Sequence, residues 1–269
     1  MMQTQEKDEA LIIGRNPVLE ALKAEEPLDT IYMNGTGGSL GRICTMAKSR
    51  GIVVKNVTEQ KLSQMANGAA HQGVIATGAC ASYVTLEDLL DISRKKGTAP
   101  FLIVCDEIED PHNLGAIIRT AETAGADGVI IPKRRSAGLT AIVAKTSAGA
   151  VSYMPVARVA NISATLKELQ EKGVWIFGTA ADGNTTLYSA DLKGPAAIVI
   201  GSEGDGMSRL VAEACDFKVS IPMHGHISSL NASNAAAILL YEAVRQRIAA
   251  GLDRVPAFVP WHGEGQIDH

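Results

Sequence analysis

Two loops in the carboxyl-terminal half of the chain have the composition of a ligand-binding site. Each follows a short apolar stretch, residues 198–200 and 217–221, and each is rich in glycine and small polar residues. Glycine lets backbone N–H and C=O groups approach a ligand closely, because no side chain intervenes. In open parallel sheets, ligands bind where loops leave the carboxyl ends of strands. We therefore expect a small, charged ligand between these two loops.

The second loop leads into the clearest helical pattern of the sequence. Ser228, Ser229, Asn231 and Ser233 can supply capping oxygens, the middle of the helix is rich in Ala, Ile and Leu, and Gly251 can close it. Ser229 and Asn231 therefore have two interpretations, capping of the helix and a role in the site. The two do not exclude one another.

Other polar groups near these loops are weaker candidates for chemistry. Residues 201–206, GSEGDG, lack the G-x-G-x-x-G order of a dinucleotide-binding loop. The carboxylates of residues 106–110 have no His or Cys nearby, which favours a solvated strand end over a metal site. His224 and His226 have no visible third ligand. The sequence therefore predicts no metal ion.

Three motifs occur in an order that resembles the SpoU/TrmH family of RNA ribose 2'-O-methyltransferases. They are DPHNLG at 110–115 with RTA at 119–121, then residues 198–206, and then IPM at 221–223 followed by SSLNAS at 228–233. The match spans residues 101–250. Residues 11–80 are similar to the small RNA-binding domain of RlmB-type members, which methylate a guanosine of large-subunit (23S) ribosomal RNA.

The resemblance implies that S-adenosyl-L-methionine is the cofactor. It places Gly201, Ile221, Met223 and Leu230 around this molecule, mostly through main-chain atoms, with Thr179 as a further candidate. The glycine-rich composition of the first loop agrees with close approach of the backbone to an adenosine.

The same resemblance implies that Asn113, Arg119, Glu203, Ser229 and Asn231 carry the methyl transfer. The reaction is an in-line displacement, so the enzyme must align the ribose oxygen with the methyl group and remove its proton. Asn113 can hold a hydroxyl or a backbone group, and Arg119 can clamp a phosphate bidentately. Because arginine stays protonated, we expect Arg119 to act by electrostatics and positioning. Glu203 is expected to fix Arg119 or to form part of the substrate site, with a plain turn carboxylate as the alternative.

Alternating strand and helix signals along 269 residues, 46% of them hydrophobic, predict a two-domain α/β protein. Residues 101–108 are predicted to form a strand that is buried on both faces of a parallel sheet. A loop at 110–113 and a helix at 114–124 are predicted to follow it. A short helical stretch and the sequence SRKKGTAP make residues 81–100 the predicted linker. The predicted domains are residues 1–80 and 101–269, and the resemblance implies that the first is L30e-like and the second a SPOUT domain.

Two further properties follow from the resemblance alone. It implies a deep trefoil knot in the SPOUT domain, which general topology rules would argue against. It also implies a homodimer with the cofactor site at the interface between subunits.

In the small domain, two segments are candidates for RNA contact. Arg15 and Asn16 lie between a strand at 10–13 and a helix that Asn16 is expected to cap. The tripeptide His71-Gln72-Gly73 precedes the last strand, and the resemblance places it on the RNA-facing side. Ordinary polar loop residues are the alternative interpretation.

The formal net charge of −4 argues against a nucleic-acid partner only weakly, because a local basic patch is enough to bind phosphates. Lys133, Arg134 and Arg135 form the sharpest basic cluster, with Lys145 and Arg158 further along the chain. Such a run is usually a solvated surface, but beside motifs of RNA modification we predict that it binds RNA.

The four cysteines are widely spaced, which indicates buried free thiols in a reducing compartment. The polar amino terminus has no apolar core of a signal peptide, and no apolar run reaches the length of a membrane span. We therefore expect a cytoplasmic location and no membrane partner.

The sequence leaves more than one function open. A transfer-RNA methylase or an antibiotic-resistance rRNA methylase would use the same catalytic motifs. A noncatalytic RNA-binding factor of ribosome assembly could retain the fold, although the presence of every motif residue weighs against it.

Overall fold

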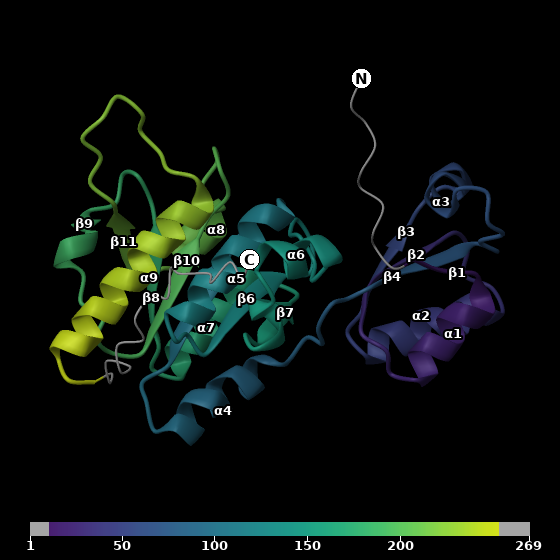
Figure 1. Ribbon diagram of the computed structural model, residues 1–269, viewed down its shortest axis with the longest axis horizontal. Coiled ribbons are helices and arrows are strands. Elements are labelled where there is room, and N and C mark those ends of the chain that lie inside the picture. Colours follow the sequence, from purple (N-terminus) through teal and green to yellow (C-terminus); the bar gives the residue numbers. More distant parts are fainter. Residues whose placement is uncertain (1–10, 253–269) are drawn as a thin grey trace, which may run out of the picture.

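A computed structural model of the protein describes residues 11–252, which form two α/β domains (Figure 1). Residues 1–10 and 253–269 lie outside the described residues, and with them the polar amino-terminal segment and the outer ends of both predicted domains. No helix in the described range is long and apolar enough to cross a membrane.

The small domain is a four-stranded sheet covered by helices on both faces. Its strands lie in the order β1-β4-β2-β3, with β4 antiparallel to both neighbours and β2 parallel to β3. Buried Val18, Leu22 and Ile43 fill one face, and Leu62 packs against Ile75 on the other. The elements are β1 (Leu11–Ile13), α1 (Arg15–Lys23), β2 (Leu28–Met33), α2 (Ser39–Ser49), β3 (Val53–Asn56), α3 (Glu59–Ala66) and β4 (Val74–Gly78).

The start of α1 differs from the prediction. The helix begins at Arg15, and its N-cap is Gly14, so the expected cap at Asn16 is wrong. Gly14 has a φ of 99°, which glycine adopts without strain, and its N–H donates to the Val74 carbonyl at 3.1 Å. Because the sheet holds Gly14 in this conformation, the chain turns into the helix earlier than the sequence pattern indicates.

The segment between the domains is attached to the second domain over most of its length. The Cys80 N–H donates to the Leu139 carbonyl at 2.7 Å, and the Val84 N–H donates to Val156 at 2.9 Å. Helix α4 (Leu86–Lys96) follows, and its buried Leu89 and Leu90 belong to a core of the second domain. The predicted linker, residues 81–100, is therefore mainly a packed helix.

The second domain is a seven-stranded parallel sheet in the order β7-β6-β5-β10-β8-β11-β9. Its strands are β5 (Phe101–Cys105), β6 (Gly128–Pro132), β7 (Val156–Val159), β8 (Trp175–Thr179), β9 (Thr185–Thr186), β10 (Ala196–Ile200) and β11 (Phe217–Ser220). Its helices are α5 (Pro111–Thr123), α6 (Ala141–Thr146), α7 (Ile162–Glu171), α8 (Arg209–Glu213) and α9 (Ala232–Ala249), with 3-10 turns η1 (Ala150–Ser152) and η2 (Leu187–Ser189).

Strand β5 is buried on both faces, as its apolar run predicts. Phe101, Ile103 and Cys105 point into one core, and Leu102 and Val104 point into the other. Since successive side chains of a strand point to opposite faces, one strand serves both layers. Helices α5, α6 and α9 cover the first face, and α4, α7 and α8 cover the second.

Helix α5 begins three residues earlier than predicted, so the expected loop at 110–113 is wrong. Asp110 is the N-cap, and its side chain accepts from the His112 N–H at 2.9 Å. Pro111 takes the first helical position, where a missing N–H costs nothing. Asn113 consequently lies in the first turn of a helix, which fixes its direction more tightly than a loop would.

The cysteines are free, and they differ in burial. Burial raises the pKa of the Cys105 thiol to about 12, and it likewise raises that of Cys215 to about 12. Cys80 is exposed, so the expectation of buried thiols is wrong for this residue. Partial burial nevertheless raises the pKa of its thiol.

Gly115 provides a test of how α5 is held. A Cβ at this position would lie 1.9 Å from Thr146 Oγ1 and 2.8 Å from Thr146 Cβ on α6. Helix propensity favours alanine over glycine by about 1 kcal/mol, but overpacking costs about 1–3 kcal/mol, so we expect Gly115→Ala to destabilise the protein. Urea unfolding measures the change.

Gly194→Ala is the matched control, because no atom lies within 4 Å of its added Cβ. It should change the unfolding free energy by less than about 0.5 kcal/mol. Adding Thr146→Ala to the Gly115 variant should recover part of the loss. Equal stabilities for the two glycine variants would contradict the close contact of α5 with α6.

Candidate active site

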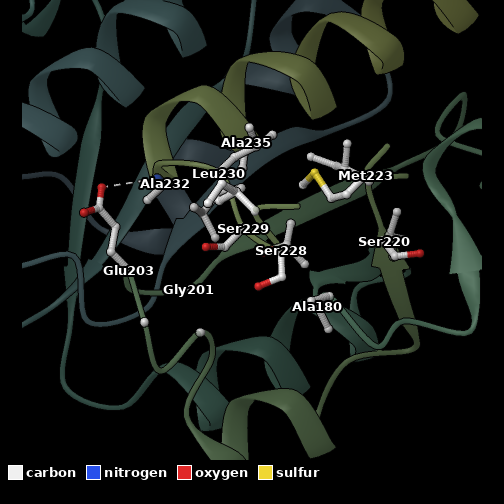
Figure 2. Close-up of a pocket in the computed structure, with 18 of the residues that line it drawn as sticks. Ala180, Gly201, Glu203, Ser220, Met223, Ser228, Ser229, Leu230, Ala232 and Ala235 are labelled. Carbon is white, nitrogen blue, oxygen red and sulfur yellow. Dashed lines mark hydrogen bonds between the residues drawn. The ribbon is translucent and has the colours of Figure 1, made fainter. Parts of the chain in front are cut away.

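A cavity of about 540 Å³ lies at the carboxyl ends of β8, β10 and β11, where the glycine-rich loops leave the sheet (Figure 2). This volume is in the range of small-molecule and cofactor sites. Glu203 and Ser229 lie on one side of it, with Met223 and Ser220 on the other. All the residues predicted to bind the cofactor are on its wall, namely Thr179, Gly201, Ile221, Met223 and Leu230.

The loop after β10 closes on itself beside this cavity. The Ser202 N–H donates to the Gly206 carbonyl at 2.9 Å, and the Gly206 N–H returns a bond to Ser202 at 3.1 Å. A Cβ on Gly201 would lie 2.2 Å from the Gly206 carbonyl carbon. Only glycine fits at this position, and the loop therefore presents main chain to the cavity.

A hydrogen-bonded cluster of two amides and a carboxylate borders the cavity. Asn113 Nδ2 donates to Glu203 Oε1 at 2.9 Å, and Asn231 Nδ2 donates to Asn113 Oδ1 at 2.9 Å. Asn231 Nδ2 also donates to Glu203 Oε1. The structure thus brings together three of the predicted catalytic residues, which come from α5, the loop after β10 and the start of α9.

Asn231 both caps α9 and joins the hydrogen-bonded cluster. Its Oδ1 caps α9 by accepting from the N–H groups of Ser233 at 2.9 Å and Asn234 at 3.3 Å. Its amide nitrogen makes the contacts with Asn113 and Glu203. Ser229 does not cap the helix; it is exposed and lines the cavity (Figure 2).

Arg119 does not join this cluster within the chain. It lies six residues after Asn113 on α5, which places it about 9 Å along the helix axis and on a different side of the helix. Asn113 is buried and Arg119 is exposed. The Arg119 guanidinium makes no hydrogen bond or ion pair with residues 11–252.

The predicted RNA-binding segments of the small domain meet in space. The Arg15 side chain donates through Nε to the Gln72 carbonyl at 2.8 Å, and Gln72 Oε1 accepts from the Arg15 N–H at 3.2 Å. Gln72 and Gly73 both have positive φ, 51° and 80°. We call this unit, Arg15 with residues 71–73, the reading turn. Asn16 is exposed beside it.

His71 holds the reading turn from beneath. Its ring is 9% exposed; Nδ1 accepts from the Gly73 N–H at 3.1 Å, and Nε2 lies 3.3 Å from both Ser63 Oγ and Glu59 Oε1. Since Nδ1 is the acceptor, the neutral ring carries its proton on Nε2. That His71 contacts RNA directly stays a prediction.

The basic residues separate into different environments. Arg135 is exposed and pairs with Glu107 at 2.8 Å, which raises the pKa of its guanidinium. Lys133 and Arg134 follow β6, and the Lys133 ammonium lies close to Gly51 of the small domain. Arg158 is a different case, because it is buried and forms an ion pair with Asp29.

Several residues of these sites were missed by the sequence analysis. Ala180 and Ala181 follow β8 on the cavity wall, and the rule on strand ends could have found them. Ala235 on α9 gave no signal, because it looks like any helical alanine. The contact of Glu59 and Ser63 with His71 also left no pattern in the sequence.

Each of the two domains matches a protein-family model. Residues 100–241 match the SpoU rRNA Methylase family, and residues 11–84 match the family of RNA 2'-O ribose methyltransferase substrate-binding domains. The chain belongs to the SpoU/TrmH family. It is an RNA methyltransferase, and S-adenosylmethionine is the cofactor.

Individual relatives extend over both domains. A protein named as a TrmH family tRNA/rRNA methyltransferase, YacO from Bacillus subtilis (strain 168), is 47% identical over 242 residues, which are 89% of this chain and 97% of that protein. The crystal structure of the SpoU methyltransferase AviRb from Streptomyces viridochromogenes with AdoMet has a TM-score of 0.58 at 26% identity, over 90% of this chain and 91% of that one.

Two further solved structures differ in how much of this chain they cover. An AdoMet-bound rRNA methyltransferase from Sinorhizobium meliloti has a TM-score of 0.55 and 27% identity, covering 87% of this chain and 86% of that one. The A. aeolicus TrmH/SpoU tRNA modifying enzyme has a TM-score of 0.54 and 27% identity, covering 62% of this chain and 85% of that one.

The cavity of this methyltransferase fits S-adenosylmethionine in size and lining. Backbone groups of the close-packed Gly201 loop suit an adenosine, and the apolar side chains of Ile221, Met223 and Leu230 suit the remainder of such a molecule. Which of these residues bind it stays a prediction. Among residues 11–252 there is no group of three His, Cys, Asp or Glu side chains that could hold a metal ion.

Asn231→Ser tests whether the amide cluster has a role besides capping. Serine retains an N-cap oxygen, so its unfolding free energy should stay about 1 kcal/mol above that of a variant without the cap. It cannot donate to Asn113 and Glu203 together. Loss of a hydrogen bond to a charged group costs about 1.5–3 kcal/mol, so we expect methyl transfer to fall about 10- to 100-fold in a radiolabel assay.

Asn231→Ala is the companion variant. It removes the cap as well and should cost about 1 kcal/mol of stability in addition to the same loss of activity. Full activity of the serine variant would reduce Asn231 to a capping residue.

Proposed function

We propose that the protein transfers a methyl group from S-adenosylmethionine to the 2'-hydroxyl of a guanosine in 23S ribosomal RNA. The observation that carries the proposal is the combination of the Asn113–Glu203–Asn231 cluster at a cofactor-sized cavity with a separate substrate-binding domain. The family model matched by that domain describes ribose 2'-O methylation, which supports a hydroxyl rather than a base atom as the acceptor.

We infer a ribosomal rather than a transfer RNA from the presence of the small domain. The solved structure named as an rRNA methyltransferase covers 87% of this chain, which requires both domains. The tRNA modifying enzyme covers only 62%, close to the length of the second domain. A transfer-RNA or antibiotic-resistance rRNA methylase remains the alternative, because the catalytic cluster would be the same.

The chain's own groups can perform the positioning that the reaction needs. S-adenosylmethionine supplies an electrophilic methyl group on a sulfonium. Glu203 uses Oε1 to accept from Asn113 and Asn231, while Oε2 has no hydrogen-bond partner in the described range. We propose that Oε2 accepts the hydrogen bond of the ribose 2'-hydroxyl and that Ser229, exposed on the cavity wall, holds a neighbouring substrate oxygen.

RNA binding is proposed to involve both domains. The reading turn would contact bases or backbone, with His71 shaping it from below, and Asn16 is exposed next to it. Lys133, Arg134 and Arg135 would neutralise phosphates, because they lie in a loop after β6 at the side of the sheet that carries the loops. Arg158 is not part of this surface, since it is buried.

We further propose that the protein acts as a homodimer with the cofactor cavity at the interface. Ile227, Leu230, Ile238 and Tyr241 are exposed on the cavity loop and α9, and such apolar surface suits a second copy. Arg119 is exposed on α5, which packs beside α9. It would therefore serve a substrate bound in the cavity of the partner subunit. The trefoil knot implied by the family stays a prediction.

The primary test is methyl transfer to RNA of known sequence. We expect the purified protein to methylate a transcript of 23S ribosomal RNA and to leave transfer RNA unmodified, and mapping of 2'-O-methyl groups should find one guanosine. Glu203→Gln keeps an Oε1 acceptor without the charge and should bind cofactor normally while losing most activity. Methylation of transfer RNA alone would select the alternative, and no methylation of either would favour an assembly factor.

Mixed dimers test whether Arg119 acts across the interface. As pure proteins, Arg119→Ala should be inactive and Asn231→Ser should keep at most about a tenth of wild-type activity. If Arg119 serves the other subunit, a heterodimer of the two variants contains one intact site, and equal mixing should restore up to about a quarter of wild-type activity. If both residues act within one subunit, no activity returns.

A further inference from the structure

A buried polar cluster joins the two domains at a point remote from the cofactor cavity. Asp29 at the start of β2 accepts from the Tyr83 hydroxyl at 2.6 Å and from Arg158 Nη1 of β7 at 3.0 Å. Arg158 Nη1 also donates to the Asp29 carbonyl at 2.9 Å. The three residues come from the small domain, the connecting segment and the second domain.

The cluster is shielded from water. The side chains of Arg158 and Asp29 are only 6% and 9% exposed. The Arg158 guanidinium also lies over the Tyr83 ring, 4.9 Å from its centre. Burial, followed by the charge of Asp29, raises the pKa of the Tyr83 phenol, so its hydroxyl keeps the proton that it donates. A buried ion pair of this kind contributes little net stability but tolerates few other geometries.

The backbone of the second domain also packs closely against Tyr83 and Asp29, without any contribution from charge. The Tyr83 oxygen accepts from the Leu139 N–H at 2.9 Å. A Cβ on the neighbouring Gly138 would lie 2.0 Å from Asp29 Oδ1. The loop of the second domain can approach the Asp29 carboxylate only because residue 138 is glycine.

The junction and the reading turn lie at opposite ends of the small sheet. Strand β2 begins at the junction with Leu28 and Asp29, and Asn34, after its end, donates to the Gly73 carbonyl at 2.9 Å. Five residues of strand span about 17 Å, so a rotation of about 10° at the junction would move the reading turn by about 3 Å. Misplacement of a substrate by 1 Å can cost about 100-fold in rate.

We propose that Asp29, Tyr83 and Arg158 form an interdomain clamp that sets which ribose reaches the cofactor cavity. They are positioning residues: the clamp fixes the reading turn relative to the second domain, and RNA held by that turn is presented at one register. This rests on the proposed function for its RNA, but the domain geometry itself can be measured without RNA.

The test uses the full-length protein with Arg158→Met, Asp29→Asn with Arg158→Met, and Gly138→Ala. The single Arg158 variant leaves a buried carboxylate unpaired and should unfold at lower urea, whereas the double variant removes both charges and should recover stability. Asp127→Asn is the matched control, because this buried carboxylate pairs with Lys96 at 2.7 Å away from the domain junction.

We expect the double variant and Gly138→Ala to show a larger radius of gyration by small-angle X-ray scattering without RNA. Methylation of the native ribose should fall at least about 10-fold in kcat/KM, with new minor sites in the map, while the Kd for S-adenosylmethionine stays within about twofold. Asp127→Asn should lose stability yet keep the site map.

An unchanged scattering curve and site map in the double variant would overturn the clamp, even if Arg158→Met alone fails to fold. If the wild-type protein methylates no RNA, the proposed function fails, and the scattering comparison still decides whether these residues hold the domains together.

Discussion

The hydrogen bonds among Asn113, Glu203 and Asn231 are the constraint on which the active site depends. Glu203 lies 90 residues after Asn113 along the chain, and Asn231 lies 118 residues after it. The loops that follow the carboxyl ends of the parallel strands lie at one edge of the sheet, which brings these distant segments together. The close fit of Gly115 against Thr146 and the cap at Asp110 then fix the direction of Asn113 on α5.

The cofactor cavity and the reading turn are built from different parts of the chain. The cavity is built from backbone, because Gly201 packs against Gly206 too closely for any side chain. The reading turn is built from side chains that hold backbone, since Arg15 and His71 both bond to main-chain groups of residues 72 and 73. The cavity thus presents fixed main chain, whereas the turn is a projection shaped by side chains.

Under the proposed function, RNA held by the reading turn must reach the cavity, so the connection between the domains becomes part of the proposed mechanism. Cys80, Tyr83 and Val84 are hydrogen-bonded to the second domain, and α4 is packed into its core, so the connecting segment has little freedom. Asp29 and Arg158 meet at this connection. A charge pair that adds little to stability can therefore matter for orientation.

The sequence by itself determined most of the strands and helices, the family, the cofactor and the loops that form the cavity wall, because apolar periodicity and motif spacing are local properties. It missed α6, β7 and β9, which are short. It placed the start of α5 and the cap of α1 wrongly, since Asp110 and Gly14 are set by contacts at helix ends. Tertiary structure alone decided the partners of charged residues. Arg158 looked like Lys145 in a basic pattern, yet it is buried against Asp29, and Arg119 lies away from Asn113. Such pairings depend on which elements meet in space, and spacing along one chain does not record that.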